Sequence, residues 1–441
     1  MLLRFVAENF LSFKEAAEIN TIASSKSRVL RHHCVKCGHT HVLRLNAIYG
    51  ANGAGKSNLV KALNFLKNWM MVETLEKATV SFPFYFKMDK ACATAHTAFT
   101  VDYLAEDHIY SYRIEFDNAQ IYYEKLLRKG KYEDHVLFIR NDSDIQWWGE
   151  GKSGKLDAPL LDAILRMLRM DMPLLLFMGR YYPELSFEVS AAYRWFTDNL
   201  SVEEPTSFPE ILPHLFDILP LFAEKSKQLF AAIDKGIVSL GVKKVIMDEN
   251  VENYHSPMRE AVDFAMKHPH IPYSFEGPLN GNLVNVVYED NQLVKKTMTI
   301  THLSADGEPV EFDYAEESDG IRHFMEYLSM LHSLSVGEVY VVDDIERSIH
   351  PVLMKKIMEI IANNEDIKGQ LIFTAHESNL LDQSLLRPDE IWLAEKNEEQ
   401  ATEFYRLSDY KVHHTANLQN RYLEGRYGGV PIVDKLDKFH K

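Results

Sequence analysis

Near both ends of the chain, short apolar runs alternate with segments whose apolar residues recur at helical spacing. Residues 41–49 (HVLRLNAIY), 339–342 (VYVV) and 370–375 (QLIFTA) are apolar runs typical of buried strands. Between 59 and 66, apolar residues recur at spacings of three and four, which predicts a helix after the first run. A second helix is predicted over 351–363, between the two later runs. Strand, helix and strand in this order predict a parallel α/β sheet.

Two inner stretches have a different character. Residues 82–138 contain alternating segments such as AFTVDYL and YSYRIEF, which predict antiparallel strands. Residues 157–244 are rich in Leu, Met, Ala and Phe at helical spacing and predict a helical insertion without sustained heptads. We therefore divide the chain into three parts: the first part of an α/β head (1–150), a helical insertion (151–295) and the second part of the head (296–441).

Composition narrows the class of protein. The 441 residues are 46% hydrophobic and 25% charged, which is ordinary for a globular chain of two or three domains. No stretch of about 20 apolar residues predicts a membrane helix, and the N-terminus does not resemble a secretory signal, so we expect a cytoplasmic protein. The net charge of −16 argues against a protein that coats nucleic acid. Three cysteines are too few for a disulfide framework.

The segment GANGAGKS, residues 50–57, matches the phosphate-binding pattern G-x-x-x-x-G-K-[ST] in full. Its glycines allow a tight loop whose N–H groups face phosphate oxygens, and the helix that follows adds its positive end. Lys56 is expected to reach the β- and γ-phosphates of ATP, and Ser57 to offer its hydroxyl to Mg²⁺. The predicted nucleotide-binding residues are Gly50, Asn52, Gly53, Gly55, Lys56, Ser57 and Asn58.

Acidic residues follow the apolar run VYVV, at the end of a predicted strand. Asp343 is expected to hold Mg²⁺ with Ser57, and Asp344 to position the attacking water. Related ATPases usually have Glu at the second position; the shorter Asp344 predicts slow hydrolysis, or help from Glu346. His376, at the end of QLIFTAH, is expected to contact the γ-phosphate. The predicted catalytic residues are Asp344, His376 and Lys56; the alternatives are a solvated acidic turn and an ordinary histidine at a strand end.

With these motifs in order, the chain resembles the ABC/SMC-like P-loop ATPases. It is similar in particular to ATPases of the OLD (overcoming lysogenization defect), abortive-infection and other anti-phage group. RFVAENFLSFKE, NAIYGANGAGKSNLVKAL, ESDGIRHF, IERSIHP, FTAHESNLLD and LRPDEIWLAEK carry the resemblance. It implies an ABC-type head, with a mixed sheet, flanking helices and an antiparallel β lobe, together with the helical insertion. No Toprim nuclease module is expected.

The resemblance also implies partners. In this superfamily a signature loop of one subunit caps the ATP of the other, so Ser318 and Gly320 would contact the γ-phosphate in a homodimer or higher homo-oligomer. Asp319 replaces the first glycine of the common signature; an ordinary helix cap is the alternative role for Ser318 or Asp319. The implied function is an ATPase sensor or scaffold in anti-phage defence that controls a separately encoded nuclease or toxin. The alternatives are an SMC-like ATPase that acts directly on DNA and a binding switch with negligible turnover.

A stretch rich in Cys, His and basic residues precedes the phosphate loop. Cys34 and Cys37, with His39 and His41 close behind, suggest a zinc site if the segment curls, and a plain polar loop otherwise. The basic residues of 26–44 and of KLLRKGKY suggest either contact with nucleic acid or a solvated face.

Overall fold

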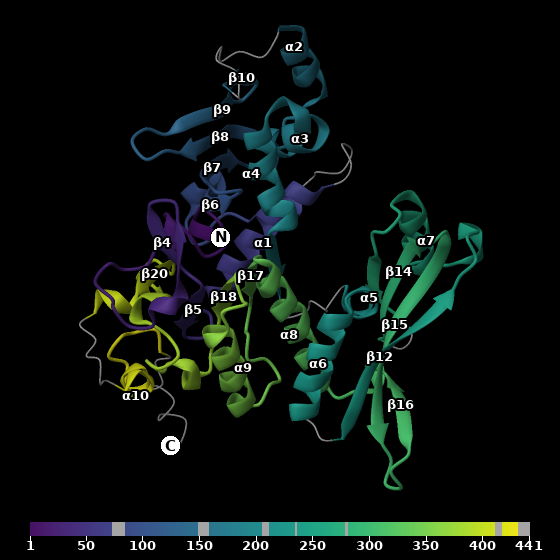
Figure 1. Cartoon of the computed structure of the whole chain (residues 1–441). Helices are drawn as coiled ribbons and strands as arrows, with labels where there is room; N and C mark the ends of the chain where they lie inside the picture. Colours follow the sequence, from purple (N-terminus) through teal and green to yellow (C-terminus); the bar gives the residue numbers. More distant parts are fainter. Residues whose placement is uncertain are drawn as a thin grey trace. The chain divides into compact units, whose positions relative to one another are not determined.

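The computed structural model describes residues 1–72, 84–148, 158–204, 211–233, 236–277, 281–410 and 417–430. These residues form two compact units (Figure 1). The first unit contains Met1–Pro205, Ser333–Glu346 and Pro351–Lys441, and the second contains Thr206–His332 and Arg347–His350. The first unit is therefore assembled from both ends of the chain. Among the described helices, none is both long and apolar enough to cross a membrane.

A six-stranded sheet lies at the centre of the first unit, in the order β11-β17-β18-β5-β19-β20. The pairs from β11 to β19 are parallel, and β20 pairs antiparallel with β19. Every residue of β5 and of β18 is buried, as expected for inner parallel strands with apolar sequences. The strands are β5 (Leu45–Gly50), β11 (Leu200–Glu203), β17 (Val339–Val342), β18 (Gln370–Thr374), β19 (Ile391–Lys396) and β20 (Thr402–Arg406).

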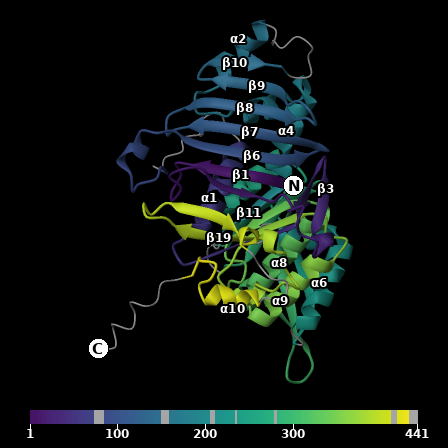
Figure 2. The same ribbon diagram turned by 90° about the vertical axis from the view of Figure 1, so that its left-hand side faces the viewer.

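A seven-stranded antiparallel sheet forms a second layer of this unit, in the order β10-β9-β8-β7-β6-β1-β2 (Figure 2). Buried and partly exposed residues alternate along β6 and β7, so one face of the sheet covers the core. The strands are β1 (Leu2–Glu8), β2 (Ala17–Asn20), β6 (Thr97–Ala105), β7 (His108–Phe116), β8 (Ile121–Lys129), β9 (His135–Asn141) and β10 (Asp144–Trp147). This sheet is the antiparallel lobe that the sequence predicts.

Helices and one hairpin complete the first unit. Aromatic residues of α1 and α4 pack against the antiparallel sheet: the Trp69 ring lies 4.7 Å from that of Phe116, and the Trp195 ring 4.3 Å from that of Tyr103. The helices are α1 (Lys56–Met71), α2 (Ala158–Met167), α3 (Leu174–Tyr181), α4 (Phe187–Asp198), α9 (Pro351–Asn363) and α10 (Leu418–Leu423), and the hairpin consists of β3 (Cys34–Cys37) and β4 (Thr40–Leu43).

The second unit contains a sheet in the order β12-β15-β14-β13, and β16 also pairs with β15. The helix α8 (Asp319–Val336) starts in this unit and ends in the first. The other elements are α5 (Leu212–Ile218), α6 (Pro220–Ile233), α7 (Met258–Lys267), β12 (Ile237–Ile246), β13 (Tyr273–Glu276), β14 (Leu283–Glu289), β15 (Gln292–Leu303) and β16 (Pro309–Asp313).

The range 151–295, predicted as a helical insertion, contains the helices α2 to α7 but also the strands β11 to β14. Residues 200–203 and 237–246 are strands, and the helices α2 to α4 belong to the first unit. The strand β12 makes an antiparallel ladder with β15 along nearly its whole length, so long-range pairing overrides the local helical spacing. The predicted boundary at 150/151 lies outside the described residues, and the one at 295/296 falls inside β15.

Candidate functional site

The phosphate-binding loop joins β5 to α1 at the carboxyl end of β5. Gly53 and Gly55 have φ angles of 78° and 105°, in the left-handed region that glycine tolerates, and Gly55 is the residue before the first turn of α1. Lys56 is buried, and its Nζ donates to the carbonyl of Gly50 at 2.9 Å. Burial lowers the Lys56 pKa, while Asp344, Asp343 and Glu346 act to raise it. The loop therefore holds a desolvated cation beside acidic groups.

Ser12 and Thr402 fix the start of α1 from two distant parts of the chain. A Cβ on Gly55 would overlap the hydroxyl oxygens of both residues. The Thr402 hydroxyl donates to the carbonyl of Ala54 at 2.7 Å and lies 2.9 Å from the Ser12 hydroxyl. Asn58 in turn donates from Nδ2 to Ser12 Oγ at 2.7 Å. This chain of hydrogen bonds accounts for the close approach that only glycine allows at Gly55.

Asp343 and Ser57 are hydrogen-bonded to each other beside the phosphate-binding loop. The Asp343 carboxylate is buried and accepts from the hydroxyl of Thr374 at 2.5 Å between Oδ1 and Oγ1. Burial raises the pKa of Asp343, and hydrogen bonds from Thr374 and Ser57 oppose this rise. A carboxylate beside a hydroxyl is an all-oxygen donor set of the kind that Mg²⁺ prefers. The residues predicted to hold Mg²⁺ are therefore in direct contact.

Asp344 and His376 form a pair next to Lys56. The Asp344 backbone has a φ of 52°, and its N–H donates to Thr374 Oγ1 at 2.8 Å. Its Oδ1 lies 3.2 Å from His376 Nε2, and His376 Nδ1 lies 3.4 Å from Lys56 Nζ. The hydrogen bond from His376 is the largest cause that lowers the Asp344 pKa. This carboxylate is therefore ionised and held in place at neutral pH.

Glu346 links the acidic turn to the backbone that carries His376. Its Oε1 accepts from the N–H groups of both His376 and Glu377, the latter at 2.9 Å. Burial raises the Glu346 pKa, and these backbone hydrogen bonds oppose the rise. Glu346 thus fixes the loop after β18 rather than pointing freely toward the phosphate-binding loop.

The comparisons with known proteins agree with this geometry. A family described as "AAA domain, putative AbiEii toxin, Type IV TA system" matches residues 45–157 and 202–382, which is more than half of the chain. The chain belongs to this family of AAA domains. This match supports the predicted P-loop ATPase fold. No curated protein matches the sequence.

Solved structures similar to this AAA-domain protein include heads of SMC proteins. An SMC head bound to the C-winged helix domain of ScpA gives a TM-score of 0.43 at 10% identity, over 92% of this chain and 97% of that one. The SMC head domain from Thermotoga maritima gives 0.37 at 9% identity, over 93% and 99%. An Smc head domain with an extended coiled coil, bound to the C-terminal domain of ScpA from Pyrococcus furiosus, gives 0.38 at 10% identity, over 100% and 99%.

The signature residues of the AAA-domain protein lie in its second unit. Ser318 Oγ accepts from the N–H of Ile321 at 3.3 Å, as a helix cap does, and Asp319 pairs with Arg322. Gly320 is in the first turn of α8. The described hydrogen bond of Ser318 and ion pair of Asp319 are both made to residues of the first turns of α8. A role toward a nucleotide bound to another subunit therefore stays a prediction.

Zinc binding at Cys34 and Cys37 is not supported. The two residues stand at opposite ends of β3, three positions apart, so their side chains leave opposite faces of the strand. Cys37 is buried beside Leu3 and Val42, whereas Cys34 Sγ accepts from Arg387 Nη1 at 3.1 Å. Burial raises the pKa of both thiols, which disfavours the thiolate that zinc requires. Within the part of the chain that the structure describes, no cluster of three or more His, Cys, Asp or Glu residues is placed to hold a metal.

Sequence reasoning missed Ser12, Thr374 and Thr402. Ser12 is the serine of the N-terminal NFLSF segment, and Thr374 is two residues before the predicted His376. A small hydroxyl at the end of an otherwise apolar strand, beside a predicted acidic pair, is the signal that would have found Thr374. No comparable signal marks Thr402, whose partner Ser12 is 390 positions away.

Proposed function

We propose that this AAA-domain protein binds ATP with Mg²⁺ and hydrolyses it to ADP and phosphate. The observation that carries the proposal is the connected set of Ser57, Asp343, Thr374, Asp344 and His376 around the phosphate-binding loop. The residues come from the ends of three neighbouring parallel strands: Ser57 follows β5, Asp343 and Asp344 follow β17, and Thr374 and His376 lie at the end of β18. Open α/β sheets bind ligands at this edge. A solvated acidic turn would not need the buried hydrogen bond between Thr374 and Asp343.

The loop residues would bind the triphosphate. Backbone N–H groups of 50–57 and the Lys56 ammonium face the phosphates, and the start of α1 adds a positive helix end. Ser57 and Asp343 would hold Mg²⁺, which when bound neutralises charge on the β- and γ-phosphates. Lys56 would exchange its bond to the Gly50 carbonyl for phosphate oxygens, and binding would thereby satisfy its buried charge better than the loop does.

Asp344 would orient the attacking water, and His376 would contact the γ-phosphate. The water oxygen forms a bond to the γ-phosphorus while the bond from that phosphorus to the bridging oxygen breaks, which releases ADP. Aspartate reaches about one methylene less far than the glutamate usual at this position, and its bond to His376 restrains it further. We therefore expect slow turnover, with Asp344 ionised throughout the neutral range.

The biological role proposed is the ATPase component of an anti-phage defence system of the OLD and abortive-infection kind. The family's description, a putative AbiEii toxin of a type IV toxin–antitoxin system, supports a role in this area. Two copies would share each ATP, with Ser318 and Gly320 of one copy capping the γ-phosphate bound to the other. A separately encoded nuclease or toxin would respond to the ATP state.

A second candidate is an ATPase that acts directly on DNA. The favouring observation is that no acidic residue occurs between Glu18 and Glu73, although the whole chain has a net charge of −16. Lys26, Arg28 and Lys36 are exposed in this segment, where phosphate contacts are possible. DNA-stimulated turnover separates this candidate from the first.

The deciding measurement is ATP turnover of the wild type, Lys56→Ala and Asp344→Asn, with and without DNA, together with the mass of the protein with ATP. We expect turnover in the wild type only, no response to DNA, and a dimer or larger oligomer with ATP. Turnover that survives Lys56→Ala would contradict the proposed site. Tight ATP binding without turnover would instead indicate a switch, and strong stimulation by DNA would favour the second candidate.

A further inference from the structure

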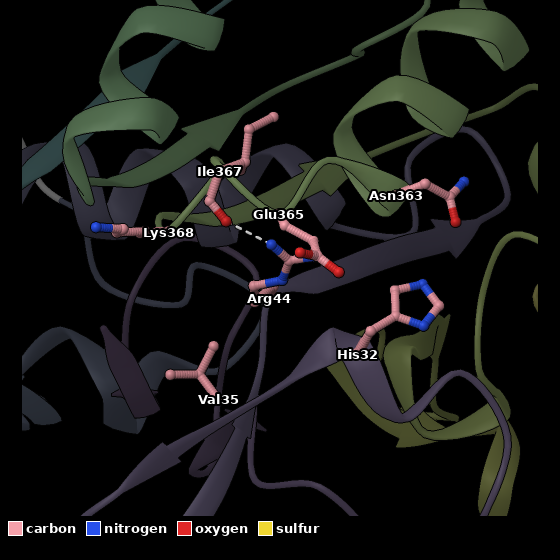
Figure 3. A pocket seen from close by; sticks show the side chains of 7 residues that line it. All are labelled: His32, Val35, Arg44, Asn363, Glu365, Ile367 and Lys368. Atoms are coloured by element: carbon pink, nitrogen blue, oxygen red, sulfur yellow. Dashed lines mark hydrogen bonds between the residues drawn. The ribbon is translucent and has the colours of Figure 1, made fainter.

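A cavity of the first unit, whose lining residues are drawn in Figure 3, lies at the opposite end of strand β5 from the phosphate-binding loop. Its volume is about 650 Å³, within the usual range for sites that bind small molecules. Arg44 immediately precedes β5, and Lys368 lies just before β18, so the cavity is at the amino ends of the central strands. The predicted ATP site lies at the carboxyl ends of the same strands, and the two sites are distinct.

Arg44 is a buried charged residue in the lining of this cavity. The side chain is only 7% exposed, and it donates to the carbonyls of Ala362 at 3.0 Å and of Ile367. These hydrogen-bond partners are uncharged; burial lowers the Arg44 pKa, and the nearby Glu390 carboxylate opposes this. The Arg44 Nε is buried and has no hydrogen-bond partner among the described residues, so the guanidinium is not fully satisfied within the fold.

The remaining lining adds one exposed cation and groups that bind hydroxyls. Lys368 is exposed, and Asn363 and Glu365 contribute amide and carboxylate groups at the end of α9. Partial burial, then the nearby His33 and Arg44, lower the His32 pKa, so this imidazole is neutral at pH 7. Arg44 and Lys368 against Glu365 give the cavity a net positive charge, in a protein whose overall charge is −16.

The segment that carries His32 is fixed to the sheet by hydrogen bonds of its neighbouring residues. His33 Nδ1 lies 2.8 Å from Glu390 Oε1, and both side chains are buried. The backbone N–H of Arg44 donates to the carbonyl of His33 at 2.9 Å, and Leu371 N donates to the Arg44 carbonyl at 2.7 Å. The cavity is thus built on the sheet rather than on a free loop, which favours a preformed site.

We propose that this cavity binds a small phosphate ester with a hydroxylated carbon skeleton, such as a sugar phosphate or a nucleotide. Arg44 and Lys368 contact the phosphate, because guanidinium and ammonium groups are the side chains that bind phosphate best. Glu365 and Asn363 bind hydroxyl groups of the skeleton, and Val35 covers its apolar side. The proposal does not depend on the ATPase reaction.

The test is calorimetric titration of the full-length protein with glucose 6-phosphate, with glucose and gluconate as neutral and carboxylate comparisons. We expect saturable binding of glucose 6-phosphate alone, unchanged in Lys56→Ala and weakened about tenfold or more in Lys368→Ala. Lys356→Ala is the matched control, because Lys356 is an exposed lysine of α9 outside the cavity lining. It should bind like the wild type.

Arg44→Gln should abolish binding; because Arg44 also holds the end of α9, the surface variant Lys368→Ala decides the matter if Arg44→Gln does not fold. Four results would overturn the proposal: no saturable heat, loss of binding in Lys56→Ala, equal binding of gluconate, or equal effects of Lys368→Ala and Lys356→Ala. The second would place the ligand in the phosphate-binding loop instead. Failure of ATP hydrolysis has no bearing on any of these results.

Discussion

Thr374 connects the two neighbouring acidic residues of the candidate site, because its hydroxyl donates to Asp343 Oδ1 at 2.5 Å and accepts from the N–H of Asp344 at 2.8 Å. One side chain thereby fixes both the proposed Mg²⁺ ligand and the backbone of the proposed water-positioning residue. This contact depends on the parallel register of β17 and β18, in which Val342 lies opposite Phe373. Thr374 is a positioning residue, and its effect should appear in metal dependence as well as in rate.

We predict that Thr374→Val lowers the rate of ATP hydrolysis about tenfold or more and raises the Mg²⁺ concentration needed for half-maximal rate. Valine keeps the size of threonine but cannot donate to the Asp343 carboxylate, and a hydrogen bond to a charged group is worth about 1.5–3 kcal/mol. Steady-state turnover across a Mg²⁺ series measures both effects. Thr374→Ser, which keeps the hydroxyl, should recover most of the activity; if it behaves like the valine variant, the positioning role is wrong.

Gly55 and Gly53 offer a matched pair of substitutions in one loop. We predict that Gly55→Ala strongly weakens ATP binding, because the new Cβ overlaps the hydroxyls of Thr402 and Ser12. Gly53→Ala has open space around its Cβ and a φ of 78°, so it incurs only the strain of the left-handed conformation, about 1–2 kcal/mol. Equilibrium titration with a fluorescent ATP analogue compares the two.

The double variant Gly55→Ala with Thr402→Ala tests the cause. Removing the Thr402 hydroxyl makes room for the added methyl, so part of the lost affinity should return. Two results would show that the contact with Thr402 does not set the requirement for glycine. One is equal ATP affinity of Gly55→Ala and Gly53→Ala, and the other is no recovery of affinity in the double variant.

Much of the first unit is predictable because its signals are local. The apolar run before the phosphate-binding loop, the loop pattern and the helical spacing after it lie within residues 41–66, so neighbouring residues determine the structure. The alternation within β6 and β7 is equally local and predicts their antiparallel pairing. In contrast, the helical spacing of the residues around β12 predicts a helix there. In the structure β12 is a strand that pairs with β15, more than 40 residues away.

Contacts between distant segments also explain what the sequence could not show outside the candidate site. Arg387 belongs to the segment LRPDEIWLAEK, to which the sequence alone assigns no chemistry. In the structure it makes two hydrogen bonds to Asp389, at 2.9 and 2.8 Å, and a third to the carbonyl of Val29. This buried group holds the basic segment that precedes the phosphate-binding loop against the sheet. Only the folded chain brings residues 29 and 387 together.

We predict that Glu124→Ala lowers the free energy of unfolding by about 3 kcal/mol or more. Glu124 is fully buried; its oxygens accept from Tyr112 Oη at 2.9 Å and from the N–H groups of Leu174 and Leu175 at 2.7 and 2.8 Å, at the start of α3. Alanine leaves these donors buried without an acceptor and Arg140 without its nearby carboxylate, 3.8 Å away. Chemical denaturation followed by tryptophan fluorescence measures the change.

Glu124→Gln keeps one acceptor oxygen and should lose less than alanine does. The matched control is Glu133→Gln, since Glu133 is exposed on the turn before β9, and its effect should stay within about 0.5 kcal/mol. Similar losses in Glu124→Ala and Glu133→Gln would mean that the buried carboxylate does not stabilise α3.

The pH dependence of stability should reveal the contribution of the Asp382 carboxylate to the free energy of unfolding. Asp382 lies six residues after His376 in the sequence. Burial acts to raise its pKa, but hydrogen bonds from Lys355 at 2.7 Å and from Ser384 outweigh it and hold the pKa at about 2. The folded protein therefore binds fewer protons at Asp382 than the unfolded chain between pH 4 and pH 2. The stabilisation is present above the unfolded pKa of about 4 and is lost as the pH falls toward 2.

We therefore predict that Asp382→Asn is less stable than the wild type by about 1 kcal/mol at pH 7, a value reduced for the partial exposure of the carboxylate. The difference between the two proteins should shrink as the pH falls from about 4 toward 2, because the wild type then also carries a neutral side chain. Urea denaturation at several pH values measures it, and Lys355→Met should show the same loss at pH 7 because it removes the partner. A difference that stays constant between pH 7 and pH 2.5 would mean that Asp382 contributes through packing rather than through its charge.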